Sequence, residues 1–270
     1  MILFVFEGDR ECPLFETIQE LFFPKEAEPF VCVYRSNIYS LYSHIKSYDR
    51  VGGEEEVDTV SVLKEILCRR GDRGLDGVAP SQVSEVYLFF DYDFHHKRGT
   101  LAENNAHLQE LLEYFNEETA HGKLYVNYPM VESIYYTGLL PDSGYRDYTV
   151  RRDECSGFKG MASRFSAYPS FDHLLLSGNK GEAEEKKRAR WLTARANWIH
   201  LMDMNVCKAN LLCNGSHTYP MKKLDIGQTR IFEAQMRKYV LTDECRVSVL
   251  NSFPLFMYEY FSEPPSLVER

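Results

Sequence analysis

The sequence predicts an α/β fold, with a parallel sheet covered by helices on both faces and then a mainly helical region. Short, wholly apolar runs, typical of strands buried on both faces, recur along the first 140 residues. Amphipathic helical segments alternate with them, which is the order of strand–helix–strand units. After about Pro141 strand signals become rare. We therefore expect a domain at residues 1–140 and a helical accessory or partner-docking region, packed against it, at 141–270.

Four apolar runs are the predicted strands of the sheet, and helical stripes separate them. The strands are residues 2–6, 30–34, 86–90 and 124–126. Pro13 favours a helix start, Pro24 stops that helix, and Asp58 can cap another. The predicted helices are 14–22, 38–45, 58–68, 103–117 and one that Pro129 opens, with residues 50–56 as a polar loop. Apolar residues at helical spacing give each helix one buried face.

The second half of the chain is predicted to hold two further helices and an aromatic tail. Residues 142–153 are expected to form a polar loop, 182–212 a long helix and 231–239 a shorter one. The tail, residues 247–261, is strongly apolar and is interrupted by Pro254. We interpret this tail as core, the alternative being an exposed docking surface.

Composition limits the class of protein. The 270 residues carry a net charge of −9, which argues against a free-standing nucleic-acid coat protein but not against an enzyme that cuts nucleic acid. Seven cysteines without CxxC pairs are typical of reduced thiols. No signal peptide and no membrane-spanning apolar stretch are present, so a cytoplasmic protein without membrane partners is expected.

Acidic residues directly follow the predicted strands. They are Glu7 and Glu11 after the first strand, Asp91 and Asp93 after the third, and Glu132 after the fourth. The carboxyl ends of parallel strands meet at one edge of a sheet, and grouped carboxylates repel one another unless a cation neutralises them. Oxygen ligands without His or Cys at metal spacing favour Mg²⁺ or Mn²⁺ over zinc. The sequence thus predicts a divalent-metal site for phosphate chemistry.

Some of these residues have simpler alternatives. Glu11 alone could serve only to favour the positive end of the following helix. Asp91 and Asp93 alternate along a strand, so both are predicted to point to one face of the sheet. His95 and His96 come next and could bind phosphate or transfer a proton, or could lie in an ordinary polar loop.

A basic stretch at residues 186–195 is the best local candidate for a nucleic-acid-binding face, because it mixes cations with Trp191. Its cations are Lys186, Lys187, Arg188, Arg190 and Arg195. The favoured alternative is a solvated helix in which the glutamates at 182–185 pair with these cations. Residues 207–217 contain two Cys and one His at spacings that fit no common zinc pattern. No Gly-rich loop followed by Lys and Ser or Thr is present, so an NTPase is not predicted.

The strand-end motifs resemble those of the Toprim domain, which topoisomerases, primases and several nucleases carry. The resemblance covers roughly residues 1–140 and rests on a strand ending in Glu-Gly and a later strand ending in Asp-x-Asp. Residues 5–11 and 127–132 most resemble nucleases of phage-defence systems, such as the RloB-like and overcoming-lysogenization-defect families and the Toprim effector of PARIS. Residues 251–256 resemble the same proteins more faintly. Many family members have a third acid where this chain has His95.

This resemblance implies a Mg²⁺-dependent (or Mn²⁺-dependent) nuclease that hydrolyses phosphodiester bonds in DNA or tRNA. Asp91 and Asp93 would hold the metal, Glu7 would be the catalytic acid or base or a ligand, and Glu11 and Glu132 would be further ligands or would position water. The resembling systems pair such a toxic effector with a separate ABC-type or AAA ATPase, so a controlling partner is expected. A homodimer is one arrangement that stays open.

Two other functions compete with the nuclease. In the first, the Toprim-like fold is a non-catalytic docking or sensor subunit of a nucleic-acid-processing complex. In the second, the site performs nucleotidyl transfer or strand passage. The second is weakened because neither a Tyr nucleophile context nor a second catalytic domain is recognisable in 270 residues.

Overall fold

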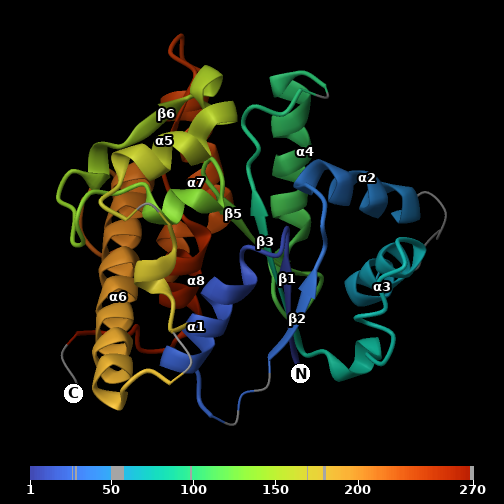
Figure 1. Cartoon of the computed structure of the whole chain (residues 1–270). Coiled ribbons are helices and arrows are strands. Elements are labelled where there is room, and N and C mark those ends of the chain that lie inside the picture. Colours follow the sequence, from blue (N-terminus) through green and yellow to red (C-terminus); the bar gives the residue numbers. More distant parts are fainter. Residues whose placement is uncertain are drawn as a thin grey trace.

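A five-stranded sheet forms the centre of the computed structural model, which describes residues 1–25, 27, 29–49, 58–97, 99–168, 170–178 and 181–267 (Figure 1). Its strands are β1 (Ile2–Phe6), β2 (Pro29–Val33), β3 (Glu85–Asp91), β4 (Asn116–Glu117) and β5 (Gly122–Asn127), in the order β2-β1-β3-β5-β4. All neighbours are parallel except β4, which pairs antiparallel with β5 at the edge. The predicted α/β class is confirmed. The predicted loop at 50–56 lies outside the described residues.

Helices cover both faces of this sheet. The α-helices are α1 (Cys12–Phe22), α2 (Ile38–Asp49), α3 (Thr59–Arg69), α4 (Leu101–Tyr114), α5 (Phe158–Phe165), α6 (Glu184–Asn214), α7 (Gln228–Gln235) and α8 (Ser252–Tyr260). Figure 1 shows α1, α6 and α8 on one side, with α2, α3 and α4 on the other. Short 3-10 turns lie at Pro80–Gln82, Val131–Tyr135, Tyr145–Asp147, Arg152–Gly157, Asp172–Leu174 and Lys223–Ile226, and a π-helical turn lies at Met236–Val240.

Helix starts follow the predicted chemistry. The Asp58 carboxylate accepts a hydrogen bond from the Ser61 N–H at 2.7 Å, so the predicted cap of α3 is confirmed. Pro13 occupies the first turn of α1, where its missing N–H costs nothing. Thr100 caps α4 by accepting from the Glu103 N–H.

Three predictions of secondary structure were wrong. The helix expected over 103–117 ends at Tyr114, because Asn116 and Glu117 pair with β5 instead. Beyond Pro129 the chain makes only the 3-10 turn Val131–Tyr135. The expected loop at 142–153 contains β6 (Thr149–Arg151), which pairs antiparallel with β7 (Arg246–Ser248) in a second, two-stranded sheet. Strands of three residues are too short to show a period of two, so only the distant partner defines them.

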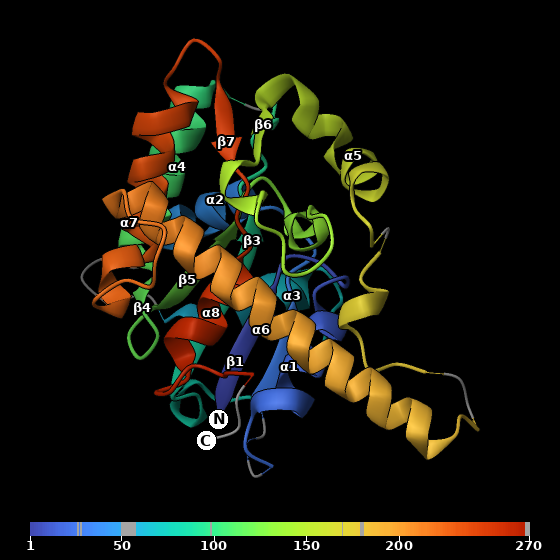
Figure 2. The ribbon, with the colours of Figure 1, turned by 90° about the vertical axis from the view of Figure 1, so that its left-hand side faces the viewer.

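The C-terminal helix α8 completes the main core. In Figure 2, α6 crosses the front of the molecule and α8 lies between it and the sheet. The Phe256 ring contacts Phe4, Tyr87, Phe89 and Tyr125, so it packs on β1, β3 and β5 together. The predicted core role of the aromatic tail is confirmed. Pro254 does not interrupt the helix, because it lies in the first turn, where no i−4 hydrogen bond is lost.

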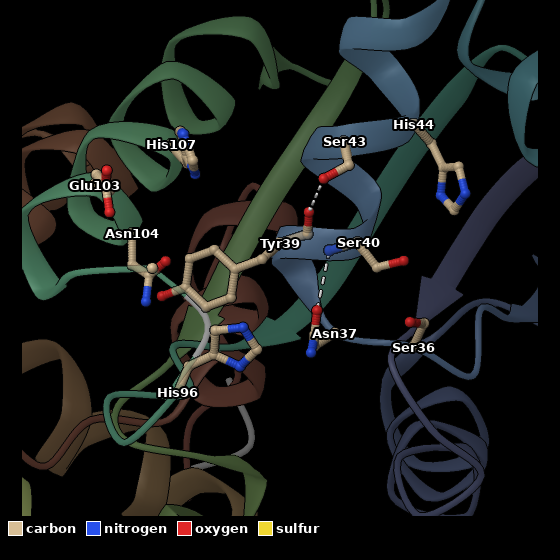
Figure 3. Close-up of a pocket in the computed structure, with 11 residues that line it drawn as sticks. Ser36, Asn37, Tyr39, Ser40, Ser43, His44, His96, Glu103, Asn104 and His107 are labelled. Carbon is tan, nitrogen blue, oxygen red and sulfur yellow. Dashed lines mark hydrogen bonds between the residues drawn. The ribbon is translucent and has the colours of Figure 1, made fainter.

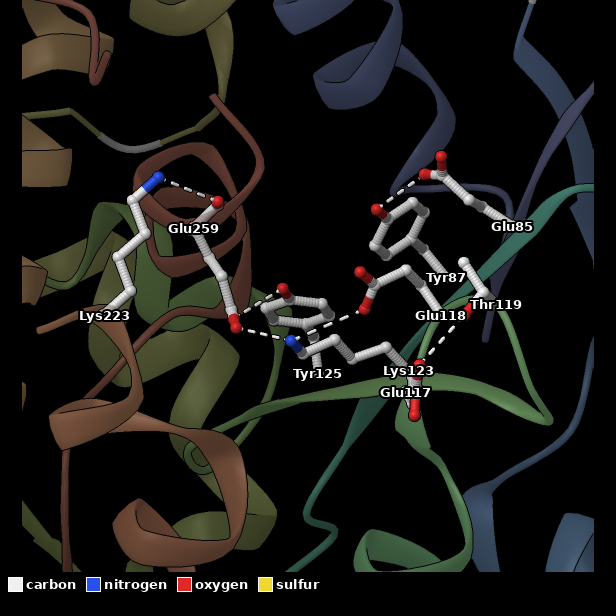
Figure 4. Close-up of polar contacts among 9 residues, drawn as sticks. All are labelled: Glu85, Tyr87, Glu117, Glu118, Thr119, Lys123, Tyr125, Lys223 and Glu259. Carbon is white, nitrogen blue, oxygen red and sulfur yellow. Dashed lines mark hydrogen bonds and ion pairs between the residues drawn. The ribbon is translucent and has the colours of Figure 1, made fainter. Parts of the chain in front are cut away.

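Polar contacts also hold α8 on the sheet (Figure 4). Glu259, near the end of the helix, forms an ion pair with Lys123 of β5 and accepts a hydrogen bond from the Tyr125 hydroxyl at 2.7 Å. The Lys223 ammonium donates to the backbone carbonyls of Glu259 and Phe261. The C-terminal half is therefore joined to the sheet by both apolar and charged contacts.

Replacing Phe256 with Ala should destabilise the protein by about 3–5 kcal/mol, because it leaves a cavity under three strands. Urea unfolding followed by circular dichroism measures the change. Leu224→Ala is the control, since Leu224 is 72% exposed. Equal loss in both variants would contradict the central role of α8 in the core.

Candidate functional site

Glu7, at the end of β1, is hydrogen-bonded to the end of β3, the strand that carries Asp91. Glu7 is the first residue after β1, and its backbone N–H donates to the carbonyl of Phe89 in β3 at 3.0 Å. Its carboxylate Oε2 accepts a hydrogen bond from the backbone N–H of Asp91 at 2.9 Å. The parallel pairing of β1 with β3 brings both strand ends to one edge of the sheet. The predicted convergence of Glu7 and Asp91 is thus present.

Asp93 also acts on this pair, but its backbone does not have the strand conformation that was predicted. β3 ends at Asp91, and Asp93 has a left-handed backbone with φ of 49°, so the expected strand alternation does not continue to it. Asp tolerates this conformation better than most residues do. The charge of Asp93 nevertheless acts on Glu7 and is the second largest cause, after desolvation, that raises the pKa of Glu7.

Glu11 and Glu132 lie beside the first three acids, and both are buried. Glu11 immediately precedes α1, and Glu132 lies in the 3-10 turn Val131–Tyr135. The charge of Glu132 raises the pKa of Glu11, and the charge of Glu11 raises that of Asp91. Arg10 forms an ion pair with Glu132 and lies over the Phe171 ring, 5.2 Å from its centroid. All five predicted carboxyl groups therefore belong to one acidic group, which we call the acidic edge.

The acidic edge favours protonated carboxyls in the absence of a cation. Desolvation, followed by the charge of Asp93, raises the pKa of Glu7 to about 8. Desolvation also raises the pKa of Glu11 to about 7, and the pKa of Asp91 and of Asp93 above their ordinary values. Loss of solvent and mutual repulsion make the ionised set unfavourable unless a positive charge arrives.

A hard divalent cation fits this donor set, since every predicted ligand presents carboxylate oxygen. Among the described residues, no three His, Cys, Asp or Glu side chains already surround one point at which an ion could lie. Mg²⁺ does not require such a cage, because it keeps several waters and uses one or two protein carboxylates. Glu7, Asp91 and Asp93 are the residues that would hold it.

One residue of the site was not predicted as such, namely Asn127 at the end of β5. Its Nδ2 donates to Asp91 Oδ1 at 3.0 Å, which favours the ionised form of that carboxyl. Its Oδ1 accepts from both the N–H and the hydroxyl of Ser252 at the start of α8. Asn127 therefore fixes the Asp91 carboxylate relative to the C-terminal helix. The signal available in the sequence was its place directly after the predicted strand at 124–126.

Asn127→Ala should weaken cation binding about 10- to 100-fold, the range typical when a residue that orients a metal ligand is lost. The midpoint of thermal unfolding, measured at increasing concentrations of Mn²⁺, gives the dissociation constant of each variant. Asn197→Ala is the matched control, because Asn197 is another buried amide that donates one hydrogen bond, to the carbonyl of His173. If both variants bind Mn²⁺ as the native protein does, Asn127 has no positioning role.

The basic stretch does not join the acidic edge. Lys187 pairs with Glu184 and Arg190 with Glu182, as the solvated-helix alternative expects. Arg195 lies over the ring of Phe22, at the end of α1 farther from the acids. Figure 1 places the first turns of α6 near the amino ends of the strands. Lys186 and Arg188 are exposed on the same turns.

The loop after Asp93 separates two clefts beside the acidic edge. His95 lines a cleft of about 570 Å³ together with Lys97, Arg151 and Arg152, and acidic residues at 153, 243 and 244 share it. The Nδ1 of His95 is buried and lacks a hydrogen-bond partner among the described residues. His96 lines the second cleft, of about 580 Å³, between α2 and α4. Cations that the sequence analysis did not select, Arg151 and Arg152 among them, are therefore closer to the acids than the basic stretch is.

Among the described helices, none combines the length and apolarity that a membrane span requires. Comparisons with protein-family models, with curated proteins and with solved structures found no match for this chain.

Proposed function

We propose that the chain is a Mg²⁺- or Mn²⁺-dependent nuclease of the Toprim type that hydrolyses phosphodiester bonds. The observation that carries this proposal is the bond from the Asp91 N–H to the Glu7 carboxylate, with Asp93 acting on the same group. These acids come from two adjacent strand ends, and their carboxylates are buried with little positive charge nearby. Such carboxylates are suited to binding a cation and to transferring a proton. A purely structural role would not require three such groups at one edge.

In this proposal each residue of the acidic edge has its own role in the reaction. A bound divalent cation would polarise the scissile phosphate and lower the pKa of water. Glu7 would move the proton, because its carboxylate lies beside the Asp91 N–H and burial raises its pKa above the ordinary value when no cation is bound. Asn127 orients Asp91, and the Arg10–Glu132 pair limits negative charge at the far side of the edge.

The proposed substrate is DNA or tRNA, and the proposed setting is anti-phage defence, in which the chain is a toxic effector controlled by a partner ATPase. The strand-end motifs that resemble phage-defence Toprim nucleases support this part. The net charge of −9 supports a requirement for local cations or a partner in substrate capture.

A non-catalytic docking or sensor subunit is the second candidate. It is favoured by the exposed apolar side chains of Met221 and Leu224, which precede α7 in the chain and are 95% and 72% exposed. Such side chains suit a protein partner.

The test is cleavage of a mixed pool of DNA and total RNA with Mg²⁺, with Mn²⁺ and with EDTA. The nuclease predicts cleavage by the native protein that EDTA abolishes and that Glu7→Gln removes. The class of nucleic acid that is cut identifies the substrate. Equal cleavage by the native protein and Glu7→Gln would refute the assignment, and no cleavage in the presence of the co-purifying partner would favour the docking subunit.

A further inference from the structure

The second cleft beside the acidic edge is a built polar pocket of about 580 Å³ (Figure 3), which is within the usual size range of ligand sites. It lies between the amino ends of α2 and α4, which are 12 and 14 residues long. The Asn37 side chain caps α2 by accepting a hydrogen bond from the Ser40 N–H. Two positive helix ends therefore meet at one pocket, and such ends attract anions.

Asn104 supplies an independent sign of a ligand. Its side chain lines the pocket, yet the residue is only 4% exposed. Its amide makes no hydrogen bond with any other described residue, and its polar atoms are not fully buried, so they are accessible from the pocket that the residue lines. Figure 3 shows the amide beside the Tyr39 ring, near His96. A ligand in the pocket would provide the missing partner.

Three imidazoles and one carboxylate are among the residues that line the pocket. The imidazoles of His44, His96 and His107 line it and can donate hydrogen bonds. The opposing group is Glu103, whose carboxylate accepts from the Thr100 N–H at 2.6 Å and is thereby held as part of the helix cap. This contact lowers the pKa of Glu103, so it stays ionised and repels an anion from its own part of the pocket, which leaves the side with the imidazoles for phosphate.

The pocket adjoins the acidic edge through two contacts. The Tyr39 hydroxyl donates to the carbonyl of Tyr92, the residue between Asp91 and Asp93, at 3.0 Å. The His96 N–H donates to the carbonyl of Asp93 at 2.7 Å. These contacts place the pocket next to the segment that carries Asp91 and Asp93.

We propose that the pocket between α2 and α4 binds one nucleotide of the substrate strand, next to the bond that is cut, through its phosphate. The inference rests on the proposed nuclease function, which it deepens by assigning a subsite. The phosphate takes hydrogen bonds from the helix ends, the Asn104 amide and the imidazoles, and the sugar and base occupy the remaining volume.

Ligand-observed NMR on the full chain in EDTA tests this subsite without cleavage. The probes are a mixture of nucleoside 5′-monophosphates, the same nucleosides without phosphate, and inorganic phosphate. We expect the nucleotides to bind at least 10-fold more tightly than either other probe. Asn104→Leu and His107→Ala should each weaken nucleotide binding at least 5-fold, and Gln109→Ala, on the same helix but outside the pocket, should not.

Thermal unfolding of each variant confirms that it is folded. If Asn104→Leu does not fold, His107→Ala still tests the subsite. Equal binding of nucleosides and nucleotides, equal binding of inorganic phosphate, or unchanged binding by both folded variants would overturn the subsite. Metal-dependent cleavage by the native protein would still stand in that case, since it depends on the acids. Nucleotide binding without any cleavage, even in the presence of the co-purifying partner, would instead retain the pocket and refute the nuclease.

Discussion

Asp91→Asn should reduce metal-dependent cleavage at least about 100-fold while leaving the fold intact. Asp91 is the last residue of β3, and its carboxylate is held by the Asn127 amide beside Glu7. Asn has nearly the same shape but supplies no charge, so the cation loses a ligand and the negative field that attracts it. Initial rates of cleavage on the substrate that the pool assay identifies measure the effect.

Asp9→Asn is the matched control for this prediction. Asp9 is also an aspartate close to the end of β1, but its side chain is 71% exposed, and Arg35 is its only ion-pair partner among the residues that the structure describes. Its replacement should change the rate less than threefold. Equal losses in the two variants would mean that a general decrease in negative charge, and not the acidic edge, explains the result.

Stability without metal should fall as the pH rises from about 4.5 to 8. The ordinary pKa of Glu7 is 4.5, and the folded protein raises it to about 8, so in this range the folded chain holds a proton that the unfolded chain has released. Glu11 adds to the effect up to about pH 7. Thermal unfolding in EDTA at several pH values measures the slope, which Glu7→Gln should reduce.

Divalent cation should reverse this loss, and more strongly at pH 8 than at pH 6, because the cation binds the ionised carboxyls of the folded state. At 100 times its dissociation constant it would stabilise the fold by about 2.7 kcal/mol. For a chain of this size that is a rise in Tm of about 5 °C. Asp91→Asn should lose most of the rise, and an equal rise produced by NaCl at matched ionic strength would contradict specific binding.

The parallel sheet was predictable because its strands are wholly apolar and their helices have clear stripes and caps. β1 matches its predicted residues, and β3 and β5 extend only one or two residues beyond theirs. The short strands β4, β6 and β7 were not predicted, since two or three residues carry no readable period and the partners of β6 and β7 are about a hundred residues apart.

The meeting of Glu7 and Asp91 at neighbouring strand ends was predictable from the sequence, but the hydrogen-bond partners of the acids were not. The bond between Asn127 and Asp91 joins residues 36 positions apart, and that between Arg10 and Glu132 joins residues 122 apart. The left-handed backbone of Asp93 also follows from tertiary packing and not from the Asp-x-Asp pattern. The cleft with Asn104 combines two helix starts that no local motif connects.

The hydrogen bonds from Ser252 to Asn127 have a consequence for synthesis of the chain in the cell. On the ribosome, β1, β3 and β5 emerge long before residues 252–260, so the sheet face that Phe256 covers stays open during translation. The amide of Asn127 that faces Asp91 is fixed only after α8 has left the exit tunnel. A nascent chain that lacks a packed α8 therefore carries Asp91 without the fixed amide that orients its carboxylate, so cation binding at Asp91 would be weaker until α8 has packed on the sheet.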